Sequence, residues 1–169
     1  MKRIITITEG ITRHPDRRMA EPVSLTIEEG EQMAIVGDNG AGKSRLVDIL
    51  TGRFPLLQNE VHYDLGDTPH RLVSDNLKYI TFRDSYGDQD GTYYYQQRWN
   101  QHDIADDQPT VGSALQNAPE RLLQLFHLDV LREKPLITLS SGEMRKFQLT
   151  KALRSQPRVL ILDNPFIGL

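Results

Sequence analysis

The hydrophobic pattern of the front half of the chain predicts two strands and a helix. Apolar and polar residues alternate over 22–27, which is typical of an antiparallel strand. A mostly apolar run at 32–36 predicts a second, buried strand. Three apolar residues with i, i+3, i+4 spacing then predict a helix, and Gly52 marks its end. These three residues are Leu46, Ile49 and Leu50.

The sequence after residue 78 predicts two further strands and a long helix. Residues 79–82 predict a strand, and residues 144–154 predict a helix that 156–157, a Gln-Pro pair, brings to an end. An apolar run then leads directly into Asp163. Such a run is typical of a strand buried on both faces of a parallel sheet.

The segment between the 32–36 strand and the first helix is a complete phosphate-binding loop, G-x-x-x-x-G-K-[ST]. Its glycines let backbone N–H groups turn toward an anion, Lys43 reaches β/γ-phosphates, and the Ser44 hydroxyl ligates Mg²⁺. The following helix offers its N-terminus to the phosphate. A glycine-rich turn that binds nothing is the weaker alternative in this context. The expected nucleotide-binding residues are Gly37, Asp38, Asn39, Gly40, Ala41, Gly42, Lys43, Ser44 and Arg45.

Asp163 is the second candidate site residue. A carboxylate at the C-terminal end of a buried strand emerges at the edge where open α/β folds bind ligands. We therefore expect Asp163 to share the Mg²⁺ held by Ser44, which is the Walker B role. The alternative, a turn or N-cap aspartate before Asn164, is weaker beside a phosphate loop.

The segment 139–143, L-S-S-G-E, comes directly before the 144–154 helix. Ser140 or Ser141 suits an N-cap, and the small residues leave N–H groups open to an anion. Taken alone, the segment is best interpreted as an ordinary capped helix start. The order of phosphate loop, L-S-S-G-E and apolar strand with Asp163, however, resembles the ATP-binding-cassette (ABC) family.

The pentapeptide is similar to the L-S-G-G-Q signature of that family. Ser141 stands for the first glycine and Glu143 for the glutamine. The string 160–169 is similar to molybdate-transport or photorepair-type ATP-binding proteins of the family. The signature residues implied by the resemblance are Leu139, Ser140, Ser141, Gly142 and Glu143.

The resemblance implies an α/β phosphate-loop NTPase fold of ABC type. Its mixed core sheet with helices would comprise 1–82 and 144–169, and a small helical subdomain about 83–143. Residues 28–31 look like the family's hairpin turn, and 122–134 like the helices leading into the signature. Because the family's cassette continues past the equivalent of residue 169, we expect a partial cassette whose C-terminal part is absent.

The residue after Asp163 departs from the family pattern. The family has a glutamate there, whereas this chain has Asn164. An amide orients water by hydrogen bonding but cannot accept its proton at neutral pH, so we expect slow hydrolysis. The residues that the resemblance assigns to catalysis are Lys43, Asp163 and Asn164.

Two further family positions are altered. The family has an aromatic residue that stacks on adenine near the end of the first strand, and this chain has no Phe, Tyr or Trp between residues 7 and 22. His14 is the only ring there. Arg13 and Ile11 are the other residues that could cover the base. The glutamine expected after the 79–82 strand is replaced by Arg83, with Gln89 as a later candidate.

The resemblance implies ATP and Mg²⁺ as cofactors and two kinds of partner. A second cassette, in the same polypeptide or a homodimer, would sandwich ATP, with Ser140 and Gly142 facing its γ-phosphate. A transmembrane permease would couple hydrolysis to transport. Two alternatives stay open: a transport-independent ATPase of the family, and a non-hydrolysing nucleotide-binding half-cassette, which Asn164 favours.

Composition narrows the class of protein. The formal charge of −3 gives no signal for nucleic acid, and the absence of cysteine excludes disulfides and thiolate zinc sites. No apolar run approaches the about 18 residues of a membrane span, so we expect a cytoplasmic protein, with a partner able to hold it at the inner face of the membrane.

The aromatic segment 92–100 is equally compatible with partner docking and with core packing. An acidic loop is a better interpretation than a metal cluster for His102, Asp103, Asp106 and Asp107.

Overall fold

The structure, a computed structural model, describes residues 2–81 and 108–165. The chain forms two compact units, Met1–Leu77 and Lys78–Leu169, each of which is considered by itself below. The division into a core of 1–82 and 144–169 and a subdomain of about 83–143 stays a prediction.

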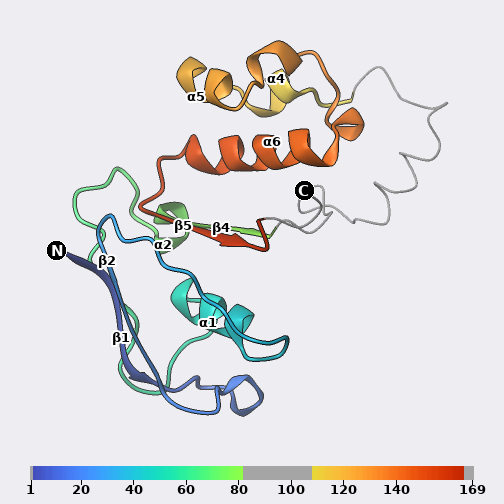
Figure 1. The fold of residues 1–169 in the computed structure, drawn as a ribbon. Helices are drawn as coiled ribbons and strands as arrows, with labels where there is room; N and C mark the ends of the chain where they lie inside the picture. The colour runs from blue at the N-terminus through green and yellow to red at the C-terminus, as the bar shows by residue number, and fades with distance from the viewer. Residues whose placement is uncertain (1, 82–107, 166–169) are drawn as a thin grey trace. The chain divides into compact units, whose positions relative to one another are not determined.

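The first unit contains a three-stranded antiparallel sheet with the order β2-β1-β3 (Figure 1). In it, Thr6 of the central strand lies opposite Thr26 on one side and His62 on the other. Alternate residues Ile5 and Ile7 are buried, as period-two burial requires. The predicted strand at 22–27 is confirmed as β2. The strands are β1 (Arg3–Gly10), β2 (Val23–Glu28) and β3 (His62–Tyr63).

Helix α1 (Lys43–Leu50) carries the predicted apolar face of this unit. Ile49 and Leu50 are buried, and the Tyr63 hydroxyl of β3 donates to the Leu50 carbonyl oxygen at 2.9 Å, which ties the helix to the sheet. The helix ends as predicted before Gly52, which has φ +74° and donates its N–H to the Ile49 carbonyl. Two short elements complete the unit, η1 (Pro15–Arg17) and α2 (Val73–Asn76).

The predicted buried strand at 32–36 is wrong for this structure. No strand is assigned anywhere from residue 29 to residue 42, and Met33, Ile35 and Val36 are exposed, Val36 to 87%. A strand needs a neighbour for its N–H and C=O groups. The sheet of this unit consists of β2, β1 and β3, so the apolar pattern is present without a partner. The turn at 28–31 forms, with Glu31 donating to the Glu28 carbonyl, but no second hairpin strand follows it.

The second unit contains a two-stranded sheet of β4 (Leu77–Thr81) and β5 (Val159–Asp163), together with a helical cluster (Figure 1). Its largest apolar cluster joins Val111, Leu128 and Leu139, all fully buried, to Met144 and Phe147. The helical elements are α4 (Val111–Ala114), α5 (Glu120–Leu125), η3 (Asp129–Leu131), η4 (Leu136–Thr138) and α6 (Ser141–Leu153).

Most of the predictions for this unit are confirmed. The helix predicted at 144–154 is α6, and Gln156 follows it in a left-handed conformation with φ +51°. The helical segment expected at 122–134 contains α5 and η3. Among residues 2–81 and 108–165, no helix has the length and apolarity to cross a membrane.

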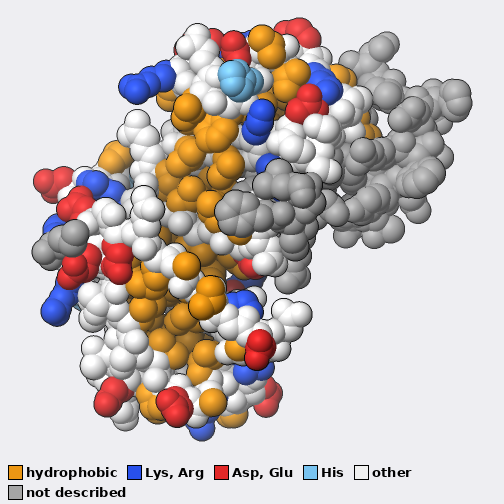
Figure 2. All heavy atoms as spheres, viewed as in Figure 1, with side chains coloured by type: hydrophobic (Ala, Val, Ile, Leu, Met, Phe, Trp, Pro, Cys, Tyr) orange, Lys and Arg blue, Asp and Glu red, His pale blue; other side chains and the backbone are white. Residues whose placement is uncertain are grey.

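One prediction for β5 is wrong. The strand forms as predicted, but it is not buried on both faces: its residues are half-buried, and Leu162 is 39% exposed. The physical reason is that β5 pairs with β4 alone in the described residues, so the strand lacks the flanking strands that bury a central strand. Apolar side chains accordingly reach the surface of the molecule (Figure 2).

Candidate functional site

The phosphate loop leads into an uncapped helix N-terminus. Gly42, the N-cap of α1, has φ +95° and makes no side-chain cap, because it has no side chain. The Lys43 ammonium folds back over the loop and donates to the carbonyl oxygens of Gly37 at 2.7 Å and Asp38 at 2.9 Å. The first N–H groups of α1 have no acceptor inside the helix and no side-chain cap, and a cation lies on the adjoining loop, which is an arrangement that suits an anion.

The segment preceding β2 lies against this loop. A side chain on Gly42 would meet Met19, whose Cε lies 2.7 Å from an ideal Cβ position. The Arg45 guanidinium donates to the Arg18 carbonyl oxygen at 3.1 Å. The left-handed backbone at position 42 thus favours glycine, and a larger residue would also have to displace the end of the flexible Met19 side chain. The Ser44 hydroxyl is exposed, and no hydrogen bond of it is recorded within the described parts of the chain.

A groove of about 670 Å³ lies in the same unit. Arg13 and His14, two of the predicted base-covering residues, line it, whereas Ile11 does not. The groove also contains Phe54, with the Arg17 guanidinium carbon 5.3 Å from the centre of its ring. Phe54 lies outside residues 7–22, where a base-covering residue was expected. It follows α1 in the sequence and comes next to Arg13 and His14 only in the folded chain.

Asp163 has a partner that sequence patterns did not reveal. It is the last residue of β5, and its Oδ2 accepts a hydrogen bond of 2.8 Å from the Tyr79 hydroxyl on β4. This bond orients the carboxylate. Asn164 follows in a left-handed conformation with φ +51°, which asparagine tolerates better than most residues.

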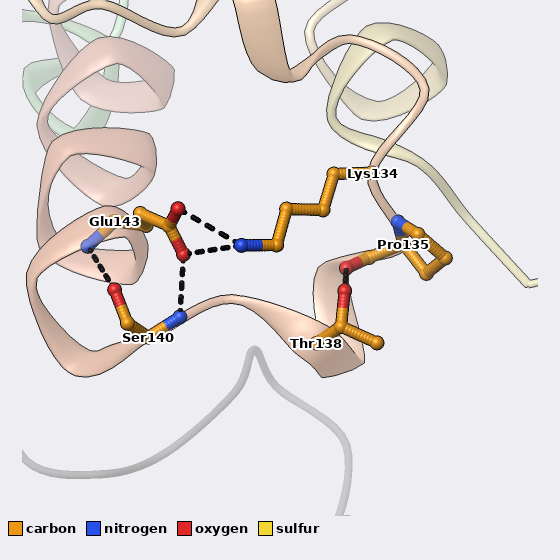
Figure 3. A network of polar contacts seen from close by, with 5 residues as sticks. All are labelled: Lys134, Pro135, Thr138, Ser140 and Glu143. Atoms are coloured by element: carbon orange, nitrogen blue, oxygen red, sulfur yellow. Dashed lines mark hydrogen bonds and ion pairs between the residues drawn. The ribbon is translucent and has the colours of Figure 1, made fainter.

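The signature segment forms a capping box, as Figure 3 shows. Of the two predicted candidates, Ser140 is the N-cap of α6, and Ser141 is the first residue of the helix. The Glu143 N–H donates to Ser140 Oγ at 3.3 Å, and the Ser140 N–H donates to Glu143 Oε2 at 2.7 Å. Leu139 is fully buried and anchors the segment, whereas Ser141 and Gly142 are exposed.

Glu143 also binds Lys134, a residue that sequence reasoning missed. The Lys134 ammonium donates to Oε1 at 2.9 Å and to Oε2 at 2.8 Å. The hydrogen bond from Lys134, followed by the one from the Ser140 N–H, holds the pKa of Glu143 below its usual range. The carboxylate is therefore charged at neutral pH and is paired with a cation.

The predicted residues thus fall into three local groups. The phosphate-loop residues lie together, the signature residues lie together, and Asp163 lies with Tyr79. Ser44 and Asp163 belong to different units, so their shared metal stays a prediction. Arg83, Gln89, segment 92–100 and the acidic loop at 102–107 lie outside the described residues. In the parts described, no group of three potential ligand side chains from His, Cys, Asp and Glu is positioned to hold a metal ion.

A family model described as ABC transporter matches residues 20–167 of the chain. The ABC transporter ATP-binding protein ModF of Escherichia coli is 32% identical over 175 aligned positions, which cover 98% of this chain and 33% of ModF. The lipopolysaccharide export system ATP-binding protein LptB of E. coli is 29% identical over 156 positions, covering 90% of this chain and 63% of LptB. The chain therefore spans less than two thirds of the length of these relatives.

Solved structures share the fold. The chain matches cbiO1 from Clostridium perfringens, part of the ABC transporter complex cbiONQ, with a TM-score of 0.71 and 20% identity, covering all of this chain and 68% of cbiO1. It matches the ADP conformation of MJ1267, an ATP-binding cassette of an ABC transporter, with a TM-score of 0.68 and 17% identity, covering 100% of this chain and 71% of that one. These matches agree with an α/β phosphate-loop fold.

Proposed function

The chain belongs to the ABC transporter family, and on that basis we propose that it binds Mg·ATP and hydrolyses it slowly as the nucleotide-binding part of a transporter. The observation that carries the proposal is the N-terminus of α1, which has no side-chain cap and whose first residue, Lys43, places its ammonium on the carbonyl oxygens of Gly37 and Asp38 in the phosphate loop. A location in the cytoplasm, held at the inner face of the membrane by a permease, belongs to the same proposal.

Each residue of the loop has a role in binding. Lys43 exchanges its bonds to the Gly37 and Asp38 carbonyls for bonds to β/γ-phosphate oxygens, as a point charge. The N–H groups of Gly42, Lys43 and Ser44 at the start of α1 would cradle the phosphates, whereas the Ala41 N–H donates to the Asp38 carbonyl oxygen at 3.1 Å. A hydroxyl and a carboxylate are hard oxygen ligands, so Ser44 and Asp163 fit Mg²⁺ by their chemistry. The ion, when bound, neutralises charge on the phosphates.

Catalysis depends on the group beside Asp163. Asn164 orients a water molecule but does not take its proton, so turnover lacks the general-base contribution of about 10²–10⁴-fold. Tyr79 keeps the Asp163 carboxylate in one orientation through its hydrogen bond of 2.8 Å. The same asparagine favours a second candidate function, a nucleotide-binding half-cassette that does not hydrolyse ATP.

The partner in this proposal is a second cassette, in the same polypeptide or in a homodimer. The exposed Ser140 and Gly142 would face the γ-phosphate held by that partner's phosphate loop. Among the described residues, no atom lies within 4 Å of a Cβ placed on Gly142.

Calorimetric titration with Mg·ATP tests binding. We expect Lys43→Ala to weaken ATP binding at least about tenfold, because a charge on phosphate is lost, and to change the thermal transition much less, because the two bonds to loop carbonyls that it also removes are exposed. The control is Lys146→Ala, an exposed lysine of α6, which should bind as the wild type does. Equal ATP affinity in the wild type and Lys43→Ala would refute the assignment.

Phosphate release distinguishes the enzyme from the half-cassette. Asn164→Glu should raise turnover, by up to the about 10²–10⁴-fold of a general base. Glutamate is strained at the left-handed conformation of residue 164, so Asn164→Asp, which also supplies a carboxylate and suits that conformation better, is the matched variant. If neither variant exceeds the wild type, another group positions the water.

A further inference from the structure

We propose that Lys134 is the counter-charge of the signature loop: it neutralises Glu143 and thereby allows the loop to approach the γ-phosphate of a nucleotide held by a second cassette. The inference rests on the proposed function. It makes Lys134 a positioning residue, because it acts through Glu143 and not on the nucleotide itself.

The first step is the geometry of the pair. One ammonium bonds both oxygens of the Glu143 carboxylate, at 2.9 and 2.8 Å, and Figure 3 shows the two side chains directed at each other. The Lys134 side chain is 33% exposed and that of Glu143 24%, so water screens the pair less than it screens a pair on open surface.

The backbone around Lys134 is held by the apolar cluster of the same unit. Its carbonyl oxygen accepts from the N–H of the fully buried Val111 at 3.0 Å, and its N–H donates to the Leu131 carbonyl at 2.9 Å. Pro135 forms an isolated bridge with Thr110. The lysine is therefore attached to the core of the helical cluster, not to the signature helix that it contacts.

The hydrogen-bond arrangement at α6 leaves two N–H groups for a ligand. The capping box uses the N–H groups of Ser140 and Glu143. Ser141 and Gly142 are the first two residues of the helix, whose N–H groups have no acceptor inside it, and both residues are exposed. The carboxylate lies next in sequence to this pair of donors.

The charge balance explains why Lys134 is needed. Where the family signature has a neutral glutamine, this chain has an ionised carboxylate, which on its own would repel an anionic triphosphate. The Lys134 ammonium, bonded to both carboxylate oxygens, cancels that charge. The net charge at the signature loop is then zero, as it is in a chain with glutamine at this position. Removal of Lys134 alone should therefore weaken the approach of nucleotide, and simultaneous removal of both charges should restore it.

The test is a double-mutant cycle on the whole 169-residue chain with Lys134→Met, Glu143→Gln and their combination. Lys151→Met, an exposed lysine nearer the C-terminal end of α6, removes the same charge and is the control. Self-association with and without Mg·ATP is measured by sedimentation. The carboxyl pKa of Glu143 is measured by NMR without nucleotide.

We expect Lys134→Met to raise the pKa of Glu143 and to weaken ATP-dependent association roughly three- to tenfold, as one charge at close range that is largely screened by water would. The combined variant should return to within about twofold of the wild type, and Lys151→Met should stay there. A merely structural role predicts instead that the combined variant is as weak as Lys134→Met or weaker.

The results separate the two proposals. If the wild-type chain associates when Mg·ATP is added and Lys134→Met associates equally well, the inference is overturned and the proposed function is left intact. A wild-type chain that neither binds Mg·ATP nor associates on it overturns the proposed function, and the inference with it. An unchanged pKa of Glu143 in Lys134→Met also overturns the inference.

Discussion

The N-termini of α1 and α6 are both proposed to face nucleotide, yet they are built in opposite ways. At α1, Gly42 offers no cap, and the Lys43 ammonium bonds to carbonyl oxygens of the loop. At α6, Ser140 and Glu143 each accept a hydrogen bond from the other's backbone N–H, and the Lys134 ammonium binds the Glu143 carboxylate. One end is held open by glycine geometry and the other is closed by side chains.

The difference teaches how a helix end is matched to its ligand. An end that must surround several phosphate oxygens keeps its N–H groups free and uses a positive-φ backbone that glycine adopts without strain. An end that makes a single contact with a partner's nucleotide can satisfy part of itself and stay rigid without ligand. We therefore expect the α1 end to depend on ligand for its order, and the α6 end to be ordered beforehand.

The largest expected effect comes from adding one methyl group at a glycine of each helix end, Gly42 at the N-cap of α1 and Gly142 in the first turn of α6. Gly42→Ala forces a left-handed alanine into contact with Met19 and should destabilise the chain by roughly 1–3 kcal/mol and abolish tight ATP binding. Gly142→Ala meets nothing within 4 Å and should be neutral or stabilise by up to about 1 kcal/mol. Denaturant unfolding and calorimetry measure both, and similar losses in the two variants would remove the contrast.

A smaller effect is expected from the serines. Ser140→Ala removes the cap of α6 and should lower the free energy of unfolding by about 1 kcal/mol. Ser44→Ala removes a hydroxyl with no recorded structural bond and should leave unfolding unchanged while weakening the Mg²⁺ dependence of ATP binding. Thermal melts of the two variants without nucleotide decide this, and a larger loss in Ser44→Ala would contradict it.

The smallest effect concerns pH. The pKa of Glu143 is lowered in the folded chain, mainly by Lys134, so its contribution to stability is complete above the usual value of 4.5 and is lost as pH falls through the folded pKa. Lys43 bonds to carbonyl groups, which do not titrate, so the phosphate loop should show no matching loss. Unfolding measured from pH 6 down to pH 3 should show a weaker acid dependence in Glu143→Gln than in the wild type. Identical acid profiles in the two would show that the pair does not contribute.

What could be predicted from the sequence was local chemistry. The phosphate loop, the Ser140 cap and the end of α1 at Gly52 each depend on a few neighbouring residues, and all are present in the structure. The strand at 32–36 failed because an apolar run specifies a tendency to pair but not a partner. The same reason explains β5, which formed but stayed half-buried.

The sequence by itself therefore determined the local backbone features, and from them it predicts the kind of ligand and the residues that would touch it, since backbone conformation, capping and charge type follow from short patterns. Only the tertiary structure decided which distant groups complete the sites. The Tyr79 hydroxyl bonds Asp163, which lies 84 positions later in the sequence. The Phe54 ring lies under the Arg17 guanidinium in the groove. The Lys134 ammonium bonds Glu143 on the far side of η4 in the sequence. Contacts of this kind depend on which elements pack together, and no local pattern contains that information.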